Sequence, residues 1–154
     1  MSLRSWRTCD SDPNCQTYLA TVSTMHIFSD VSNYLPPDVK AEIVRLRPGK
    51  KASDFQKTIA HLEQRRYLLD NLKHGQGCET AHCCRHIREC PISYMDPQDK
   101  PTEQRPLKVN FSGPPCLPWT SLGSLAGYAH DTIEAYNTWL ATVVASAPDI
   151  IFLE

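Results

Sequence analysis

The sequence of 154 residues lacks long hydrophobic runs, and no apolar stretch approaches the roughly 20 residues that a membrane-spanning helix needs. Its first residues contain no apolar segment of signal-peptide length, so secretion is not indicated. Neither sign of charge is in excess, because the sequence has 16 Lys and Arg residues and 17 Asp and Glu residues. The net charge of −1 excludes a strongly basic nucleic-acid arm and a polybasic membrane patch. We therefore expect a nuclear or other intracellular protein without a membrane partner.

Glycine is also scarce, with six residues against twelve prolines, which indicates rigid loops rather than flexible tails. Internal repeats and low-complexity tracts are missing from the sequence. What is present is an apolar content of 41%, enough for a core in a chain of one-domain length. Cysteine is abundant, and five of the seven cysteines lie between Cys78 and Cys116. Without a secretion signal, this pattern favours reduced thiols, with metal binding or catalysis as their roles, over disulfides.

Helix-start signals predict three helices in the first half of the chain. Asp12 is a good N-cap, and the proline after it suits the first helical position. A second helix is predicted between Pro36 and Pro48, and a third from Ser53, whose spacing to Gln56 is that of a capping box. The apolar face of the third helix would consist of Phe55, Ile59, Leu62, Leu69 and Leu72. Residues 38–73 hold nine Lys and Arg against five Asp and Glu, which we interpret as a solvated helix surface rather than a phosphate site.

Short strands are predicted at 2–9 and 25–28, ahead of the second helix. Residues 74–106 change character, because cysteine, histidine and proline gather there. We interpret this stretch as a loop-rich insertion with one short helix at 80–89.

The C-terminal third predicts a βαβ unit. Residues 107–112 alternate apolar and polar side chains like a strand. Asp131 and Glu134 have the spacing of a capping pair that opens a helix, and Pro148 ends it. The apolar face expected for this helix consists of Ile133, Tyr136, Trp139, Leu140, Val143 and Ala147. The apolar run 149–153 fits a buried strand, and this order of elements implies a parallel sheet.

Cys116 and Glu154 each follow a predicted strand of this unit. Ligands of open parallel sheets bind outside the carboxyl ends of the strands, and a thiolate held there is placed to attack. If the two strands are neighbours, their ends lie roughly 5 Å apart. We predict a catalytic pair of cysteine and carboxyl group. The alternatives are a buried structural cysteine and a frayed terminal residue.

The residues around this pair resemble a known family. Segment 113–127 reads Gly-Pro-Pro-Cys-Leu-Pro-Trp-Thr-Ser-Leu-Gly-Ser-Leu-Ala-Gly. It is similar to the catalytic loop of the C5-cytosine DNA methyltransferases, which carries Pro-Cys-Gln, an aromatic residue, Ser and two glycines four apart. Segment 148–154, Pro-Asp-Ile-Ile-Phe-Leu-Glu, resembles the family's Pro-x-(apolar)-Glu-Asn-Val segment, cut after the Glu.

Two upstream segments resemble the cofactor side of the same family. Segment 8–18 is similar to the strand end that usually reads Glu-x-Asp, where an acidic residue binds the ribose of S-adenosylmethionine, so Asp10 would take that role. Segment 25–31 is similar to the Gly-Asp-Ile segment at the adenine end, so Asp30 would take its place. By the same resemblance, Pro115 next to the cysteine is assigned to the cofactor site.

The resemblance implies an α/β fold, a partial Rossmann-like sheet of an S-adenosylmethionine-dependent methyltransferase, with helices on both faces and a Cys/His-rich insertion. Residues 1–35 would form the cofactor side, 36–106 the helical and Cys/His-rich insertion, and 107–154 the catalytic segment. In the implied mechanism, a flipped cytosine is attacked at C6 by the Cys116 thiolate, and Glu154 holds N3 and the exocyclic amine. C5 then takes the methyl group. DNA is the implied substrate, and RNA stays open because related enzymes methylate tRNA by the same chemistry.

The sequence also departs from the family pattern. Leu117 replaces the usual Gln, and Asp10 is shorter than the usual Glu. The Phe-x-Gly-x-Gly segment, the Arg-rich strand and the target-recognition domain have no counterpart here. We therefore expect a fragment or diverged remnant that is weak or inactive alone and requires the missing segments or another chain. The alternative is a catalytically inactive binding module, stabilised by zinc, that engages a partner through its Cys/His cluster.

Seven Cys and His residues fall within positions 74–90. Zinc takes four nitrogen or sulfur ligands in a tetrahedron, commonly in spaced pairs. The predicted ligands are Cys78, Cys83, His86 and Cys90. Cys84 or His82 would serve as substitutes, and reduced thiols without metal remain the alternative.

Overall fold

The computed structural model describes residues 7–22, 26–72, 80–92, 107–114, 117–120 and 125–153. The protein is a mixed α/β chain that divides into two compact units. We call them the hairpin unit, from residues 1–35 and 78–105, and the helical unit, from 36–77 and 106–154. Among the described residues, no helix combines the length and the apolarity that crossing a membrane requires.

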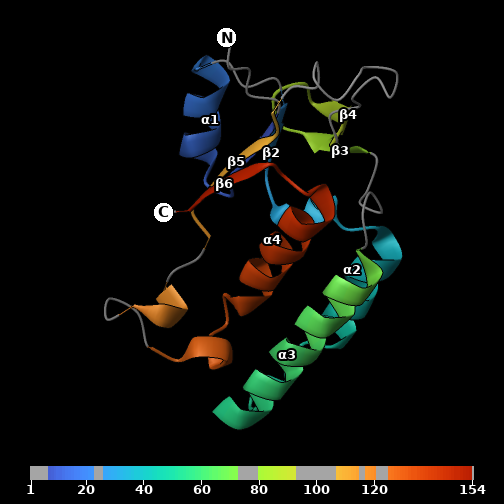
Figure 1. Ribbon diagram of the computed structural model, residues 1–154, viewed down its shortest axis with the longest axis vertical. Helices are drawn as coiled ribbons and strands as arrows, with labels where there is room; N and C mark the ends of the chain where they lie inside the picture. Colours follow the sequence, from blue (N-terminus) through green and yellow to red (C-terminus); the bar gives the residue numbers. More distant parts are fainter. Residues whose placement is uncertain are drawn as a thin grey trace. The chain divides into compact units, whose positions relative to one another are not determined.

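The hairpin unit begins with a parallel strand pair (Figure 1). β1 (Arg7–Cys9) pairs with β2 (His26–Phe28), and α1 (Pro13–Thr21) connects them. The predicted N-cap of α1 is confirmed, because the Asp12 carboxylate accepts a hydrogen bond of 2.7 Å from the backbone N–H of Asn14.

An antiparallel hairpin of β3 (Thr80–Cys83) and β4 (Arg88–Pro91) completes this unit. The expected helix at 80–89 is therefore wrong. Burial along β3 has a period of two, since Ala81 and Cys83 are buried while the residues between them are exposed. That alternation is the pattern of a strand with one face on a core.

The core of the hairpin unit is small. The 3-10 helix η1 (Val31–Tyr34) follows β2 and carries Tyr34 onto Phe28, with ring centroids 5.5 Å apart. The buried cluster consists of Phe28, Tyr34, Ala81, Cys83, Cys90 and Ile92. Two of these six residues are cysteines, so sulfur lies inside the core.

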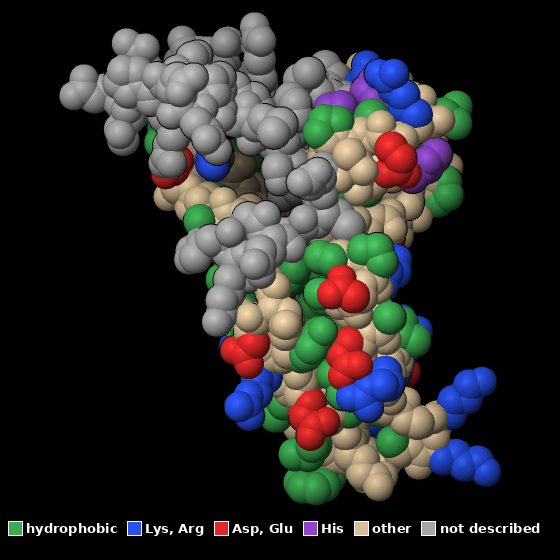
Figure 2. Space-filling model, turned by 90° about the vertical axis from the view of Figure 1, so that its right-hand side faces the viewer, with side chains coloured by type: hydrophobic (Ala, Val, Ile, Leu, Met, Phe, Trp, Pro, Cys, Tyr) green, Lys and Arg blue, Asp and Glu red, His purple; other side chains and the backbone are tan. Residues whose placement is uncertain are grey.

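Three helices form most of the helical unit, namely α2 (Pro37–Arg45), α3 (Asp54–Asn71) and α4 (Ile133–Ser146). The predicted capping box of α3 is confirmed, because the side chains and backbones of Ser53 and Gln56 bond reciprocally. Lys and Arg side chains are interspersed with Asp and Glu on the face seen in Figure 2.

The buried face of α3 agrees with the predicted one only in part, since the predicted Leu72 at the C-cap is buried at 2% exposure. Phe55, at 75% exposure, and Ile59 and Leu62, at 42% and 40%, face away from the packed side. The side that packs against α4 and η4 (Gly127–Ala129) carries His61, Gln64 and Leu68. The Gln64 NH2 group and the His61 ring are bonded to backbone carbonyls, and these bonds offset part of the cost of burying a half-polar face.

Three hydrogen bonds provide that compensation. The Gln64 amide donates to the Ile43 carbonyl at 3.0 Å, and His61 Nδ1 lies 2.7 Å from the Tyr128 carbonyl. The Asn137 amide on α4 donates to the His61 carbonyl at 2.9 Å.

The predicted capping pair of α4 is wrong. The helix begins after Thr132, and no side chain caps its N-terminus. The Asp131 carboxylate pairs instead with Lys57 at 3.1 Å, and Glu134 binds Arg47 through two bonds of 2.6 and 2.7 Å. Both carboxylates thus form ion pairs with basic side chains distant in sequence, and a local sequence pattern does not reveal such pairs.

β5 (Val109–Ser112) and β6 (Ile150–Leu153) flank α4 in sequence and pair in parallel, so the predicted βαβ unit is confirmed (Figure 1). The expected burial of the last strand is wrong, because all four residues of β6 are exposed. The strands of the described residues form three two-stranded sheets, β1–β2, β3–β4 and β5–β6. The mixed α/β class thus holds, and these residues show no continuous Rossmann-like sheet.

Candidate metal centre

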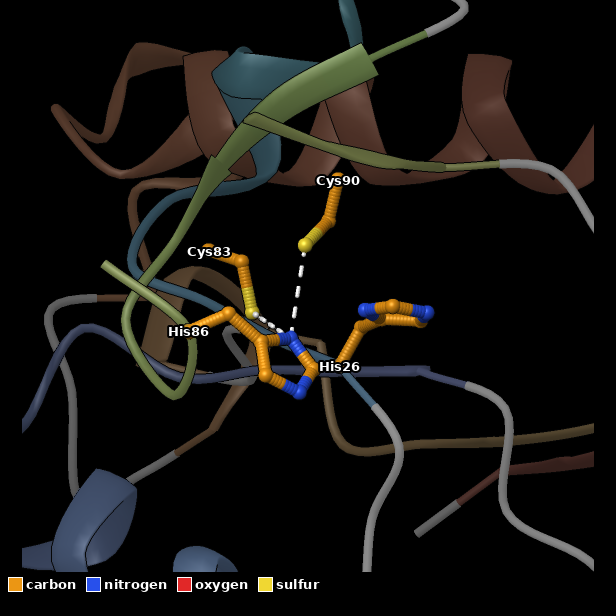
Figure 3. A group of neighbouring side chains, drawn as sticks. All are labelled: His26, Cys83, His86 and Cys90. Atoms are coloured by element: carbon orange, nitrogen blue, oxygen red, sulfur yellow. Dashed lines mark hydrogen bonds between the residues drawn. The ribbon is translucent and has the colours of Figure 1, made fainter. Parts of the chain in front are cut away.

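Four side chains of the hairpin unit converge on one point (Figure 3). His26 comes from β2, Cys83 from the end of β3, His86 from the hairpin turn and Cys90 from β4. One nitrogen or sulfur atom of each lies within 4.8 Å of those of the other three. This set of donors could hold a metal ion such as zinc.

The separations are close to those of a metal tetrahedron. His86 Nδ1 lies 3.5 Å from Cys83 Sγ and 3.3 Å from Cys90 Sγ. Zinc bonds of about 2.3 Å to sulfur and 2.0–2.1 Å to nitrogen give a sulfur–nitrogen edge of about 3.6 Å. Both sulfur–nitrogen distances therefore already match the edge of a zinc tetrahedron. The other separations among the four donor atoms are at most about an ångström longer than this edge.

The hairpin sequence explains the inward direction of both thiols. Cys83 and Cys90 occupy inward positions of antiparallel strands and are 0% and 2% exposed.

The turn between the strands is closed by a hydrogen bond of 2.8 Å from the Ile87 N–H to the Cys83 carbonyl. Ile87 has φ of 52°, a strained value for a β-branched residue, and its side chain is exposed. His86, just before it, is exposed as well, so the cluster is open to solvent on the side of the turn.

β2 is attached to the hairpin beside these ligands. The Ile27 N–H donates to Cys83 Sγ at 3.4 Å, and the Ile27 carbonyl accepts from the Cys84 N–H at 2.8 Å. The rings of His26 and His86 meet edge to face, with centroids 5.2 Å apart. An N–H aimed at sulfur stabilises a thiolate and orients it, as outer hydrogen bonds do around bound metals.

The pKa shifts have clear causes. Burial lowers the pKa of His26, and the charges of His86 and Arg88 add to the effect, which favours the neutral imidazole that binds metals. Burial raises the pKa of the Cys90 thiol, and its neighbour Cys83 raises it further. A bound cation would reverse the preference of the thiols, because it stabilises the thiolate directly.

The structure brings together three of the four predicted metal ligands, Cys83, His86 and Cys90, while Cys78 lies outside the described residues. Neither Cys84 nor His82 belongs to the group. Sequence reasoning missed His26 because only positions 74–90 were considered as one cluster. The sequence did contain a signal for His26, namely an imidazole inside a short apolar strand. In the structure, all three residues of this strand, β2, are buried.

The two predicted cofactor residues Asp10 and Asp30 lie just beyond neighbouring parallel strands. The Asp10 N–H extends the ladder by donating to the Phe28 carbonyl at 3.1 Å. Each carboxylate also accepts a local hydrogen bond, Asp10 from the Asp12 N–H at 2.9 Å and Asp30 from the Ser32 N–H at 2.7 Å. Both residues therefore lie at the carboxyl edge of one sheet.

The predicted catalytic residues Cys116 and Glu154, and the predicted cofactor residue Pro115, lie outside the described residues. The strands before them are described. β5 and β6 are parallel neighbours with Ser112 opposite Leu153, so the chain leaves both strands at the same edge.

Comparison with known proteins gives no relative for this chain. No protein-family model matches it, and neither a curated protein nor a solved structure does.

Proposed function

We propose that this chain forms part of the catalytic domain of a C5-cytosine methyltransferase, which transfers the methyl group of S-adenosylmethionine to cytosine C5 in DNA. The parallel pairing of β5 and β6 carries the proposal. The segment after β5 resembles the family's cysteine loop and the segment that contains β6 resembles its Glu segment, in the family's order.

The register of the two strands supports a shared site for both reactive groups. Glu154 directly follows Leu153, and Cys116 is four residues beyond Ser112, the partner of Leu153. Neighbouring strands lie about 4.8 Å apart, and in our proposal both reactive groups reach one pyrimidine ring from this shared edge. Strands on different sheets, or antiparallel strands, would not have supported this pairing.

The other parallel pair supports the cofactor side and a Rossmann-like arrangement. Doubly wound sheets have the common strand order 3-2-1-4-5, in which the second strand neighbours the third and the fourth neighbours the fifth. β1 with β2 and β5 with β6 agree with these two pairs. In the family, the Phe-x-Gly-x-Gly segment follows strand 1, the strand in the middle of that order. In our proposal, a strand from a further segment or from another chain takes this position.

The exposure of the β5–β6 sheet agrees with a sheet that has further neighbours. Parallel sheets normally have both faces covered. Here the exposed rings of Phe111 and Phe152 stack with centroids 4.7 Å apart, and the rest of β6 is apolar and exposed too. Such a sheet gains most of its stability when additional elements cover it.

The residues present fit S-adenosylmethionine, which supplies the methyl group when bound. Asp10 and Asp30 offer carboxylates at the carboxyl edge of parallel strands, where nucleosides bind in such sheets, Asp10 for the ribose hydroxyls and Asp30 for the adenine end.

The chemistry of the chain's own residues follows from the weakness of cytosine C5 as a nucleophile. Addition of the Cys116 thiolate to C6 forms a C–S bond and shifts the ring electrons toward C5. Glu154, hydrogen-bonded to N3 and the exocyclic amine, favours this shift. After methyl transfer, loss of the C5 proton restores the ring double bond and expels the thiolate. A covalent step thus divides one hard reaction into two.

Binding of S-adenosylmethionine, measured by calorimetry on the full 154-residue chain, tests the cofactor half. We expect binding that Asp10→Asn and Asp30→Asn each weaken about tenfold or more, as expected when a charged hydrogen bond worth about 1.5–3 kcal/mol is lost. Asp38→Asn, on exposed α2, is the matched control and should bind normally. Equal effects of all three changes would contradict the proposal.

The catalytic half is tested with DNA carrying 5-fluorocytosine, because fluorine at C5 prevents the proton loss that releases the enzyme. We expect a covalent protein–DNA species in the presence of S-adenosylmethionine, absent in Cys116→Ser and reduced in Glu154→Gln. Cys15→Ser, at an exposed cysteine, should trap normally. Trapping that persists in Cys116→Ser would exclude this cysteine as the nucleophile. An RNA oligonucleotide with the same base distinguishes the two substrate classes.

The hairpin unit favours a second candidate, a catalytically inactive binding module. Its cluster of two buried thiols and two imidazoles lies outside the segment that resembles the catalytic loop. In that case the chain engages a partner through this cluster, no covalent protein–DNA species forms, and both Asp→Asn changes leave partner binding unchanged.

A further inference from the structure

We infer that His26, Cys83, His86 and Cys90 form a structural zinc site that fastens the β3–β4 hairpin to β2. Four protein ligands fill a tetrahedron and leave no position for water, which is the mark of a structural rather than a catalytic zinc. This inference does not depend on the proposed methyltransferase activity.

The donor set selects the kind of metal. Two thiolates and two imidazoles suit zinc, whereas magnesium and calcium require oxygen ligands, which this group does not offer. Three ligands come from one hairpin with the spacing Cys-x2-His-x3-Cys, and β2 supplies the fourth. This is the spaced arrangement that tetrahedral coordination requires, with one ligand brought from a distant part of the chain.

The surroundings of the cluster are those of a metal site. Both sulfur atoms are buried, so they are shielded from water, and Cys83 Sγ accepts a hydrogen bond from the Ile27 N–H. His86 is exposed and offers a route for an ion to enter. Without a cation, two buried thiols and two imidazoles face one another at a cost in desolvation that a metal would remove.

The size of the hairpin unit explains why it needs a metal. β2 has three residues, and β3 and β4 have four each. An isolated two-stranded hairpin is marginally stable at best, and small cores usually require a disulfide or a metal. Binding to a site that does not exist in the unfolded chain contributes directly to folding.

The first experiment measures metal in the full chain, purified in the presence of a reductant. We expect one equivalent of zinc by elemental analysis. Replacement with Co2+ should give the intense visible absorption of a tetrahedral ion together with a thiolate-to-cobalt charge-transfer band. Failure to take up zinc or cobalt, or the weak absorption of an octahedral ion, would overturn the site.

Variants then identify the ligands. We expect Cys90→Ser and His26→Asn to reduce zinc affinity at least 100-fold in competition with a chromophoric chelator. Cys84→Ser and His82→Asn, in the same hairpin but outside the group, are the matched controls and should keep the parental affinity. Equal losses in ligand and control variants would overturn the assigned set.

His86→Asn keeps the test valid if a buried variant does not fold. His86 is exposed, so its replacement disturbs the packed core less than that of a buried ligand, and α3 and α4 can be monitored by hydrogen exchange as a check of folding. We expect reduced affinity with the exchange of both helices unchanged. Parental affinity in this variant, or a Cys83–Cys90 disulfide in the protein as purified under reductant, would contradict the inference.

Discussion

The hairpin unit and the helical unit bury polar groups in different ways. In the helical unit, the buried side-chain NH2 groups of Gln64 and Asn137 donate to backbone carbonyls of neighbouring helices, while their amide oxygens are buried without a hydrogen-bond partner among the described residues. In the hairpin unit, the buried donors are sulfur and imidazole atoms that converge on each other. The difference teaches that two units of one chain can bury polar groups by different chemistry, and we infer that helix packing stabilises one unit and metal coordination the other.

The two units also differ in the length of their elements. α3 has 18 residues and α4 has 14, and they pack along a common face. The strands of the hairpin unit have three or four residues each. The helical unit thus buries its apolar side chains between long packed helices, whereas the hairpin unit buries them between short strands.

Removal of zinc should give the largest contrast between the units. With a chelator and a reductant present, we expect backbone amides of residues 80–92 to lose their protection from hydrogen exchange, while those of α3 and α4 keep it. Structural zinc contributes about 10–16 kcal/mol of apparent binding free energy in zinc-finger peptides, more than a small core can replace. Mass-spectrometric exchange measures both units in one sample. Equal loss in both would show that the metal does not act on the hairpin unit alone.

Leu68→Ala should weaken the helical unit by about 2–5 kcal/mol, because Leu68 is fully buried and its truncation leaves a cavity. Leu62→Ala on the exposed face of the same helix is the control, with an expected effect within about 0.5 kcal/mol. Urea unfolding followed by helical circular dichroism measures both, and zinc content should stay unchanged. A larger effect of Leu62→Ala would mean that the apolar face expected from sequence is the packed one after all.

Ile87→Gly should stabilise the hairpin unit by about 0.5–1 kcal/mol. Glycine adopts a positive φ without strain, and the exposed Ile87 side chain loses little contact on removal. The greater flexibility of glycine in the unfolded chain offsets part of the gain. The stabilisation would appear as a higher chelator concentration needed to remove half of the zinc. Arg85→Gly, in the same turn, is the control and should not raise this concentration.

Asp131→Asn should have the smallest effect, confined to the helical unit. Hydrogen bonding to Lys57, together with its charge, lowers the pKa of Asp131 below the ordinary carboxyl value. The ion pair therefore stabilises the fold above that ordinary value and loses its effect as pH falls through the lowered pKa. Thermal unfolding at neutral and at acidic pH should show a small loss for Asp131→Asn at neutral pH only. The same loss at both pH values would exclude the ion pair as its cause.

Local signals in the sequence were sufficient where the decisive hydrogen bonds are local. Asp12 caps α1, and Ser53 with Gln56 caps α3, as the residue spacing predicts. The parallel pairing of β5 and β6 also followed from element order, because a helical crossover between adjacent strands makes them parallel.

Local signals failed where a distant partner decided the outcome. Asp131 and Glu134 have capping spacing, but they bind Lys57 and Arg47 instead. The predicted helix at 80–89 is a hairpin, because burial of alternate residues such as Cys83 against β2 outweighs local helix preference.

The starts of α1 and α3, the parallel pairing of β5 with β6 and the gathering of Cys and His residues near the hairpin were determined by the sequence by itself. These features depend on neighbours within a few positions, which a linear pattern contains. Only the tertiary structure decided which face of α3 is buried and that His26 joins the cluster. The reason is that β2 and the hairpin meet through a backbone bond between Ile27 and Cys84, and such long-range contacts depend on the whole chain being folded.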